Sequence, residues 1–182
     1  MVLLRAKIVV VPLGESDLAV INRLAGSIGG VFNRGVDILK GMRMPSEAFN
    51  ESRNQYFANI ILSKLERVKA NSRELVIGIC EEELYLPKTH FVLGSADALS
   101  GAAVVSLFHF RQEFYGLPED ENKVYPRLYK EVIHQTAYLY SIRGCLNPSC
   151  VHYESDDMMD IDNKSARLCD ICVRQLQKVF AP

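Results

Sequence analysis

The sequence predicts an α/β protein in which a twisted, mixed sheet packs against helices and a small cysteine-bearing region follows. Three observations lead to this prediction. Strand-like and helix-like stretches alternate through the first part of the chain, which is typical of a mostly parallel sheet with right-handed crossovers. Two further strand-like stretches are joined by a short link, which favours antiparallel or edge pairing. Four of the five cysteines lie beyond residue 143.

The first elements follow a strand, helix, strand order. Residues 6–13 form a continuous, β-branched apolar run, which predicts a strand covered on both faces. Ser16 or Asp17 can cap the next stretch, whose apolar residues recur at helical spacing and which Gly29-Gly30 is expected to end. A second strand is expected around residues 36–39.

The middle of the chain continues the alternation. Asn50 is expected to open a second helix, and residues 74–80 read as a third buried strand. Residues 89–93 and 102–110 are two more strand candidates, and the Gly- and Ser-rich link 94–101 between them is interpreted as a turn.

A longer helix is predicted for residues 125–142, after a polar loop at 117–122. Pro126 would fall in its first turn, where proline is tolerated. His134 and Tyr138 are four residues apart, so they share one face of this helix.

Charge and N-terminal composition bear on partners and location. The net charge is -1, and no stretch approaches the roughly 20 apolar residues of a membrane span, so neither nucleic acid nor membrane is an expected partner. Arg5 and Lys7 lie inside the first apolar run, and no small-residue cleavage site follows, which argues against a signal peptide. We therefore expect a cytoplasmic protein, in which clustered cysteines are metal ligands more often than disulfides.

The cysteines have a pattern typical of a zinc site. The spacing is C-x4-C, an 18-residue gap, then C-x2-C, and the residues are Cys145, Cys150, Cys169 and Cys172. Four thiolates around one zinc leave no position for water, so such a site is structural. Two disulfides or four unrelated cysteines are the alternatives. The zinc would hold residues 143–182 together as a C-terminal subdomain, after an N-terminal subdomain of residues 1–142.

Read together, these motifs resemble the extended signature of the archaemetzincins, a metzincin-related family of zinc metalloproteases. That signature is H-E-x-x-H-x-x-G-x-x-H, followed by cysteines at C-x4-C and a distal C-x2-C. Other stretches are also similar to the family, so that the resemblance covers nearly the whole chain: Arg53-x-Gln55-Tyr56, Leu84-Tyr85-Leu86-Pro87 and Ala103-Val104-Val105-Ser106-Leu107. The resemblance implies a metzincin-like zinc-protease fold.

This chain departs from the family at the catalytic motif. The positions of the three catalytic-zinc histidines are held by His134, Tyr138 and Gly144. The general-base glutamate is replaced by Gln135, and the glycine of the turn by Ser141. Hydrolysis needs three protein ligands, an open fourth position and a base. An amide is not a base, glycine has no ligand atom, and a tyrosine of pKa ~10 coordinates only as a phenolate.

We therefore expect a structural zinc but no catalytic zinc. The protein is predicted to be a proteolytically inactive homologue that binds a peptide or protein in the former substrate cleft. One alternative is an active zinc metallopeptidase with a rearranged site, built from His134, Tyr138 and His152 with Glu131 as an added ligand or base. A third interpretation is a zinc-stabilised interaction module of unrelated role.

Overall fold

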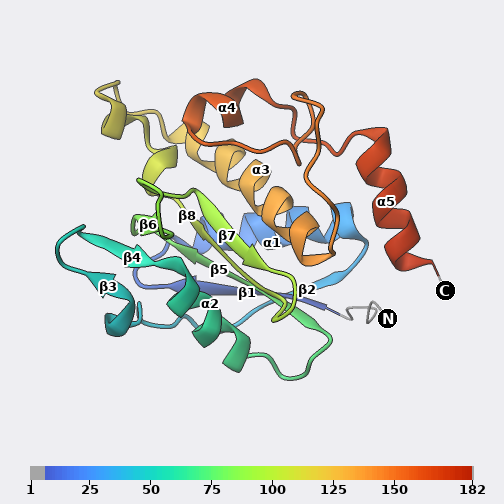
Figure 1. The fold of residues 1–182 in the computed structure, drawn as a ribbon, viewed down its shortest axis with the longest axis horizontal. Coiled ribbons are helices and arrows are strands. Elements are labelled where there is room, and N and C mark those ends of the chain that lie inside the picture. Colours follow the sequence, from blue (N-terminus) through green and yellow to red (C-terminus); the bar gives the residue numbers. More distant parts are fainter. Residues whose placement is uncertain (1–6, 182) are drawn as a thin grey trace.

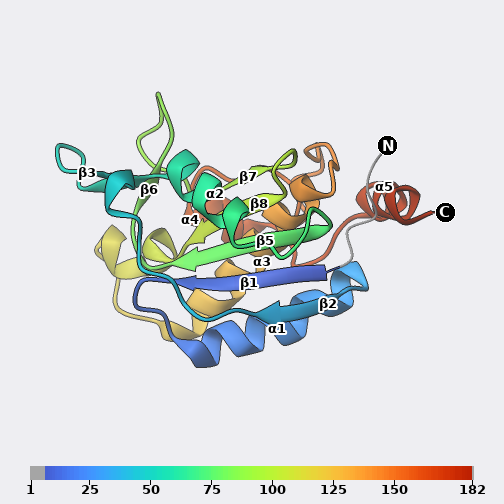
Figure 2. The same ribbon diagram turned by 90° about the horizontal axis from the view of Figure 1, so that it is seen from below.

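The computed structural model describes residues 7–181, and its centre is a five-stranded sheet (Figures 1 and 2). The strand order is β2-β1-β5-β8-β7. Four strands are parallel, and β7 pairs antiparallel with β8 at one edge. The bounds are β1 (Lys7–Leu13), β2 (Gly35–Ile38), β5 (Glu74–Cys80), β7 (Gly94–Asp97) and β8 (Ala102–Ser106). The predicted α/β class and mixed sheet are confirmed.

Helices cover both faces of this sheet. Along β1 successive side chains point to opposite faces, so Ile8 and Val10 pack with α1 (Leu18–Phe32) and α3 (Glu121–Leu139). Val9 and Val11 pack with α2 (Ala58–Arg67) on the opposite face, as Figure 2 shows. The uninterrupted apolar character of β1 follows from this burial on both sides.

Shorter elements complete the fold. A second, three-stranded sheet has the order β3-β4-β6. Its strands are β3 (Phe49–Asn50), β4 (Gln55–Phe57) and β6 (Leu84–Tyr85). Short 3-10 helices span Ser46–Ala48, Phe108–Phe110 and Gln112–Tyr115. No helix within residues 7–181 is long and apolar enough to cross a membrane.

The C-terminal segment carries α4 (Met158–Asn163) and α5 (Asp170–Phe180) and packs beside α3 (Figure 1). Its link to α3 is the buried Arg127, whose Nε and Nη2 donate to the Asp162 carboxylate at 2.8 and 2.6 Å. A third guanidinium nitrogen donates to the Phe110 carbonyl at 2.7 Å. Val151, Ile161 and Leu176 join the same apolar cluster as α3, so this segment shares the main core.

The first helix is longer than predicted. Gly29-Gly30 lies inside α1, which ends at Phe32 with Asn33 in the left-handed conformation at φ 48°. Ile28 and Phe32 are fully buried, and this packing outweighs the low helical propensity of glycine. Asp17 caps the helix as predicted, by accepting from the Ala19 amide at 2.8 Å. Arg5 and Ala6 lie outside the described residues.

The prediction that Asn50 opens the second helix is wrong. Asn50 ends β3, and its side-chain oxygen accepts from the Arg53 amide at 3.2 Å, which caps a turn rather than a helix. Gln55–Phe57 then forms β4, and the helix begins only at Ala58. The same side-chain signal serves a turn and a helix start, so sequence alone did not separate them.

Residues 89–93 do not form a strand, apart from an isolated bridge between Val92 and Leu84. The edge strand is Gly94–Asp97, so the turn is confined to residues 98–101. Likewise β8 stops at Ser106, and residues 108–110 form a 3-10 helix. The antiparallel edge pairing was predicted correctly. The carbonyls of residues 89 and 90 bond to side chains instead of to a strand.

The helix that bears His134 begins four residues earlier than predicted, at Glu121, because Asp120 caps it by accepting from the Asn122 amide at 3.1 Å. Pro126 therefore lies beyond the first turn. The helix ends at Leu139 rather than Ile142. Ser141 adopts the left-handed conformation at φ 59°, and the Ile142 amide bonds back to the Ala137 carbonyl at 3.1 Å, which makes a Schellman-type end.

Candidate metal centre and adjoining cleft

The four predicted cysteines converge. The sulphur of Cys145 lies 3.6 Å from that of Cys169, and the sulphur of Cys150 lies 3.8 Å from that of Cys172. All four sulphurs lie within 4.8 Å of one another. A tetrahedral zinc with Zn–S bonds of about 2.3 Å requires sulphurs about 3.8 Å apart, so the donor set fits zinc. A disulfide would need about 2.05 Å, and all four cysteines are free.

The local backbone prepares these sulphurs to bind a cation. The amides of His152 and Cys169 donate to the Cys150 sulphur at 3.4 and 3.3 Å, and the Asn147 amide donates to Cys145 at 3.4 Å. Burial would raise the pKa of the Cys169 thiol, but the Cys172 amide and the neighbouring thiols bring this pKa down to about 7. Cys169 also occupies the N-cap position of α5, where the helix dipole favours a thiolate.

At the positions that correspond to the family's catalytic motif, the carboxylate of Glu154 lies between the side chains of His134 and Tyr138. Glu154 Oε2 accepts from the Tyr138 hydroxyl at 2.9 Å and is 3.7 Å from His134 Nε2. His134 and then Tyr138 hold the pKa of Glu154 down to about 2, against the effect of burial. Burial and the Glu154 charge raise the pKa of Tyr138 to about 12, so its phenol stays protonated at neutral pH.

Gly144 and Tyr138 are complementary in shape. A Cβ atom placed on Gly144 would lie 3.0 Å from the Tyr138 hydroxyl oxygen, which is closer than nearly all real contacts of a Cβ. The phenol therefore occupies the space into which a side chain at position 144 would project.

Gln135 is turned toward its neighbour on α3. Its Nε2 donates to Glu131 Oε1 at 2.6 Å, and both side chains are buried. The backbone of Gly94 passes so close that a Cβ there would lie 3.0 Å from both groups. Gln135 is thus part of the wall between α3 and the edge strand.

His152 lies against the other two rings, at centroid distances of 5.0 Å from His134 and 4.7 Å from Tyr138. It is fully buried, and its Nε2 is 3.2 Å from the Ile142 carbonyl oxygen. Burial, together with the His134 charge, lowers its pKa to about 4. In the described part of the chain, the side chains around His134 do not bring three histidine, cysteine or acidic ligand atoms within 4.8 Å of one another.

A cleft of about 430 Å³ opens beside these groups. Its walls are residues 88–94, Glu131 and Gln135 of α3, and residues 154–156. The 88–94 wall is fixed by Arg53, whose Nη2 donates to the carbonyls of residues 89 and 90 at 2.7 and 2.8 Å. Gln55 donates to the carbonyl of residue 90 at 2.8 Å. The Arg53-x-Gln55 stretch of the resemblance therefore shapes the cleft.

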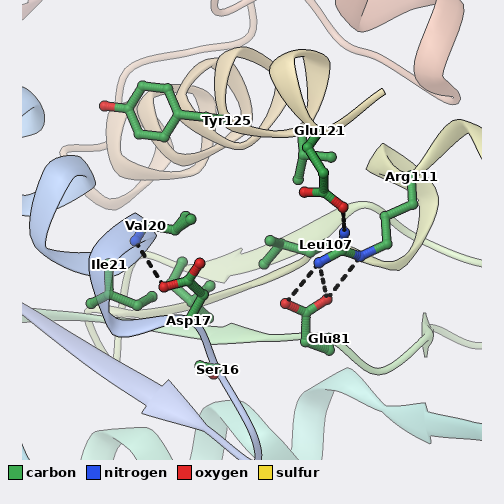
Figure 3. A pocket seen from close by; sticks show the side chains of 11 residues that line it. Ser16, Asp17, Val20, Ile21, Glu81, Leu107, Arg111, Glu121 and Tyr125 are labelled. Atoms are coloured by element: carbon green, nitrogen blue, oxygen red, sulfur yellow. Dashed lines mark hydrogen bonds and ion pairs between the residues drawn. The ribbon is translucent and has the colours of Figure 1, made fainter. Parts of the chain in front are cut away.

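A second, smaller cavity of about 60 Å³ lies where β1 and β5 end. Figure 3 shows Arg111 between Glu81 and Glu121, bonded to both, with Asp17 nearby. In open α/β sheets this edge often binds ligands, but the volume here suits only a few waters. Arg111 is paired with Glu81 and Glu121, and Asp17 caps α1, so these side chains have structural partners and we interpret the cavity as a packing feature.

Comparison with known proteins agrees with the fold. Residues 33–178 match peptidase family M54. The archaemetzincin of Pyrococcus furiosus is 33% identical over 181 residues, which cover 96% of this chain and 94% of that protein. The archaemetzincin of Methanocaldococcus jannaschii is 32% identical over 171 residues, which cover 94% of this chain and 93% of that protein.

Solved structures of archaemetzincins and related peptidases are also similar to this chain. The crystal structure of archaemetzincin from Methanopyrus kandleri matches with a TM-score of 0.84 and 25% identity, covering 97% of this chain and 96% of that one. A zinc-dependent peptidase from Methanocorpusculum labreanum matches with the same TM-score and identity, covering 93% of this chain and 99% of that one. The fold and the family match therefore place this chain in the class of zinc metallopeptidases. Within it, the chain belongs to peptidase family M54, the archaemetzincin family.

Two features of the site were absent from the sequence interpretation. Glu154 bonds to Tyr138 from a loop that carries no motif, and Lys164 is a buried lysine whose ammonium donates to the Tyr153 carbonyl at 2.9 Å. A glutamate four residues after Cys150 and a lysine in a polar loop have no spacing signal that would have singled them out.

Proposed function

We propose that this archaemetzincin-family chain holds one structural zinc and no catalytic zinc, does not hydrolyse peptide bonds, and captures a peptide in the cleft beside α3. One observation carries the proposal: the Tyr138 phenol fills the space in front of Gly144 and bonds to Glu154. The second and third metal-ligand positions have thus become one packed, hydrogen-bonded unit.

The remaining chemistry supports the loss of hydrolysis. A catalytic zinc would need His134 plus two further ligands, and its bound water would need a base. The Gln135 amide cannot accept a proton and is already bonded to Glu131. The protonated Tyr138 phenol is a poor ligand, and its hydroxyl is held by Glu154.

The cleft supports peptide capture. β7 is an edge strand of the main sheet, and its neighbouring segment 88–94 forms one wall of the cavity. Edge strands bind extended peptides through main-chain hydrogen bonds, while adjacent pockets hold the side chains. A volume of about 430 Å³ lies in the usual range for binding pockets.

The alternative is an active metallopeptidase with a rearranged site. Three buried polar atoms favour it, because none has a hydrogen-bond partner among residues 7–181: His134 Nδ1, His152 Nδ1 and Glu131 Oε2. A metal would satisfy such atoms, although they do not form a compact ligand set here. We therefore rank this function second.

Zinc counting separates the two functions. Purified protein is treated with a weak chelator, its zinc is measured by elemental analysis, and a diverse peptide pool is incubated with it and examined by mass spectrometry. One zinc per chain and no cleavage are expected for wild type and for His134→Ala. Two zincs, with one lost in His134→Ala, would overturn the proposal. No zinc at all would refute the four-thiolate site.

A restored variant provides the positive control. Replacing Gln135→Glu, Tyr138→His and Gly144→His together removes the phenol and returns the ligands and base of the family motif. A second zinc is expected in this variant and in neither Gln135→Glu nor Gly144→His alone. If Gly144→His alone gains a metal, the phenol does not close the site.

A further inference from the structure

Glu131 has an incomplete set of hydrogen bonds. Its side chain is only 2% exposed, and its Oε1 accepts from Gln135. Its Oε2 has no hydrogen-bond partner within the part of the chain that the structure describes. A buried carboxylate oxygen without a donor is costly, and Glu131 lines the cleft. Oε2 is therefore available to a donor that enters from the cleft.

The lining of the cleft has an excess of negative charge. Its acids are Glu131, Glu154 and Asp156, and its one lysine is the exposed Lys88. Burial lowers the pKa of Lys164, and the nearby charges of Glu131 and Glu154 oppose this effect. Its ammonium donates to the Tyr153 carbonyl, so it offsets part of this charge from within the protein. Three carboxylates still face two lysines.

We infer that the cleft selects a peptide that presents a cationic group, either a lysine or an arginine side chain, and that Glu131 and Glu154 bind this group. The inference rests on the proposed capture function and names the chemistry of what is captured. Glu154 suits the role because its side chain is 66% exposed and lines the cleft.

The geometry favours an organic cation over a metal ion. A metal needs its ligand atoms gathered around one point, and the acids and histidines of this region are not so gathered in the described chain. A guanidinium has five N–H donors on a planar fork, and an ammonium has three, so either can bond to carboxylates that lie farther apart. A peptide paired with the β7 edge would deliver such a side chain into the cleft.

The test uses full-length, zinc-loaded protein and fluorescence anisotropy with degenerate decapeptide pools, each acetylated and amidated, in which one central position is fixed. Pools with arginine or lysine are expected to bind about tenfold more tightly or better than pools with norleucine, because bonds to a buried charge are strong. A norleucine pool with a free amino terminus determines whether the cation is instead the peptide's own terminus.

Matched variants assign the effect to the cleft. Glu131→Gln and Glu154→Gln should each reduce the preference for the cation severalfold. Glu66→Gln, which removes an exposed acid from α2 on the far face, should leave it unchanged. Thermal unfolding confirms that each variant is folded, and the exposed Glu154 keeps the test valid if Glu131→Gln does not fold.

The outcomes separate the two proposals. If arginine, lysine and norleucine pools bind equally, the inference is overturned and peptide capture stands. If the preference survives both glutamine variants, the cation binds elsewhere and the inference is also overturned. Binding of the free-amine pool alone would overturn the assignment to a lysine or arginine side chain and identify the peptide's own amino terminus as the cation. If no pool binds, capture and inference both fail, whereas cleaved peptides would refute only the absence of hydrolysis.

Discussion

A methyl group at position 144 should destabilise the protein through Tyr138 alone. Gly144 is not among the glycines with positive φ, so alanine can adopt its backbone conformation without strain. The added Cβ would lie 3.0 Å from the Tyr138 hydroxyl oxygen, and the next nearest atom, Tyr138 Cζ, would lie at an ordinary 3.9 Å. The phenolic oxygen must therefore shift, which disturbs its 2.9 Å bond to Glu154.

The size of the effect follows from that bond. Hydrogen bonds to a charged group contribute about 1.5–3 kcal/mol, and the exposure of Glu154 reduces this to about 1 kcal/mol. In a Tyr138→Phe background the obstacle is absent, and Gly144→Ala should stabilise by about 0.5 kcal/mol through the unfolded chain. The predicted coupling free energy between the two positions is about 1 kcal/mol.

Urea denaturation of wild type, both single variants and the double variant measures this coupling when all four are loaded with zinc. The contribution of the unfolded state cancels in the cycle. If the two substitutions are additive within about 0.3 kcal/mol, the phenol does not fill the space beside Gly144, and the reasoning behind the closed ligand position fails.

Three further outcomes are expected. Ser141→Gly should raise the free energy of unfolding by about 0.5–1 kcal/mol and the Tm by ~2 °C, because glycine relieves the left-handed strain at the end of α3; a lower Tm would contradict this. The stability difference between wild type and Glu154→Gln should be largest above pH 4.5 and should shrink as the pH falls toward 2, because the folded-state pKa of Glu154 lies at about 2, below its ordinary 4.5. Urea titrations across this pH range measure the difference, and a difference that does not change with pH would refute the prediction. Cys169→Ser should reduce the zinc content from one per chain to none and weaken α5 in circular dichroism, whereas Cys80→Ala, which is not part of the cluster, should keep its zinc.

The sequence predicted the main strands well because their signal is local. The run from Glu74 to Cys80 was predicted at its observed bounds, and the run around Ile8 coincides with β1 within the described residues. Both are apolar because both faces of the central strands are buried, which is a property that each residue carries by itself. The error at Asn50 arose because the same side chain can cap either a turn or a helix. The error at residues 89–93 arose because side chains distant in sequence bond to the backbone carbonyls there.

The candidate site likewise has parts that the sequence predicted and parts that needed the structure. The cysteine spacing predicted the four-sulphur cluster, because a C-x4-C pair and a C-x2-C pair can close around one ion whatever lies between them. The differences from the family motif at Gln135, Tyr138 and Gly144 were also visible in the sequence, since all three positions belong to one short motif. The roles of Arg53 and Gln55 in holding the cleft wall needed the structure.

By itself, then, the sequence determined the α/β class, the family resemblance and the four-cysteine cluster, all of which depend on periodicity and short spacings. Only the tertiary structure decided which contacts the side chains of the catalytic-motif positions make. Glu154 is bonded to Tyr138 across 16 residues, and Gln135 meets the backbone of Gly94 across 41 positions of chain. Such contacts depend on how the edge strand, α3 and the cysteine-bearing segment pack, and no local pattern encodes that packing.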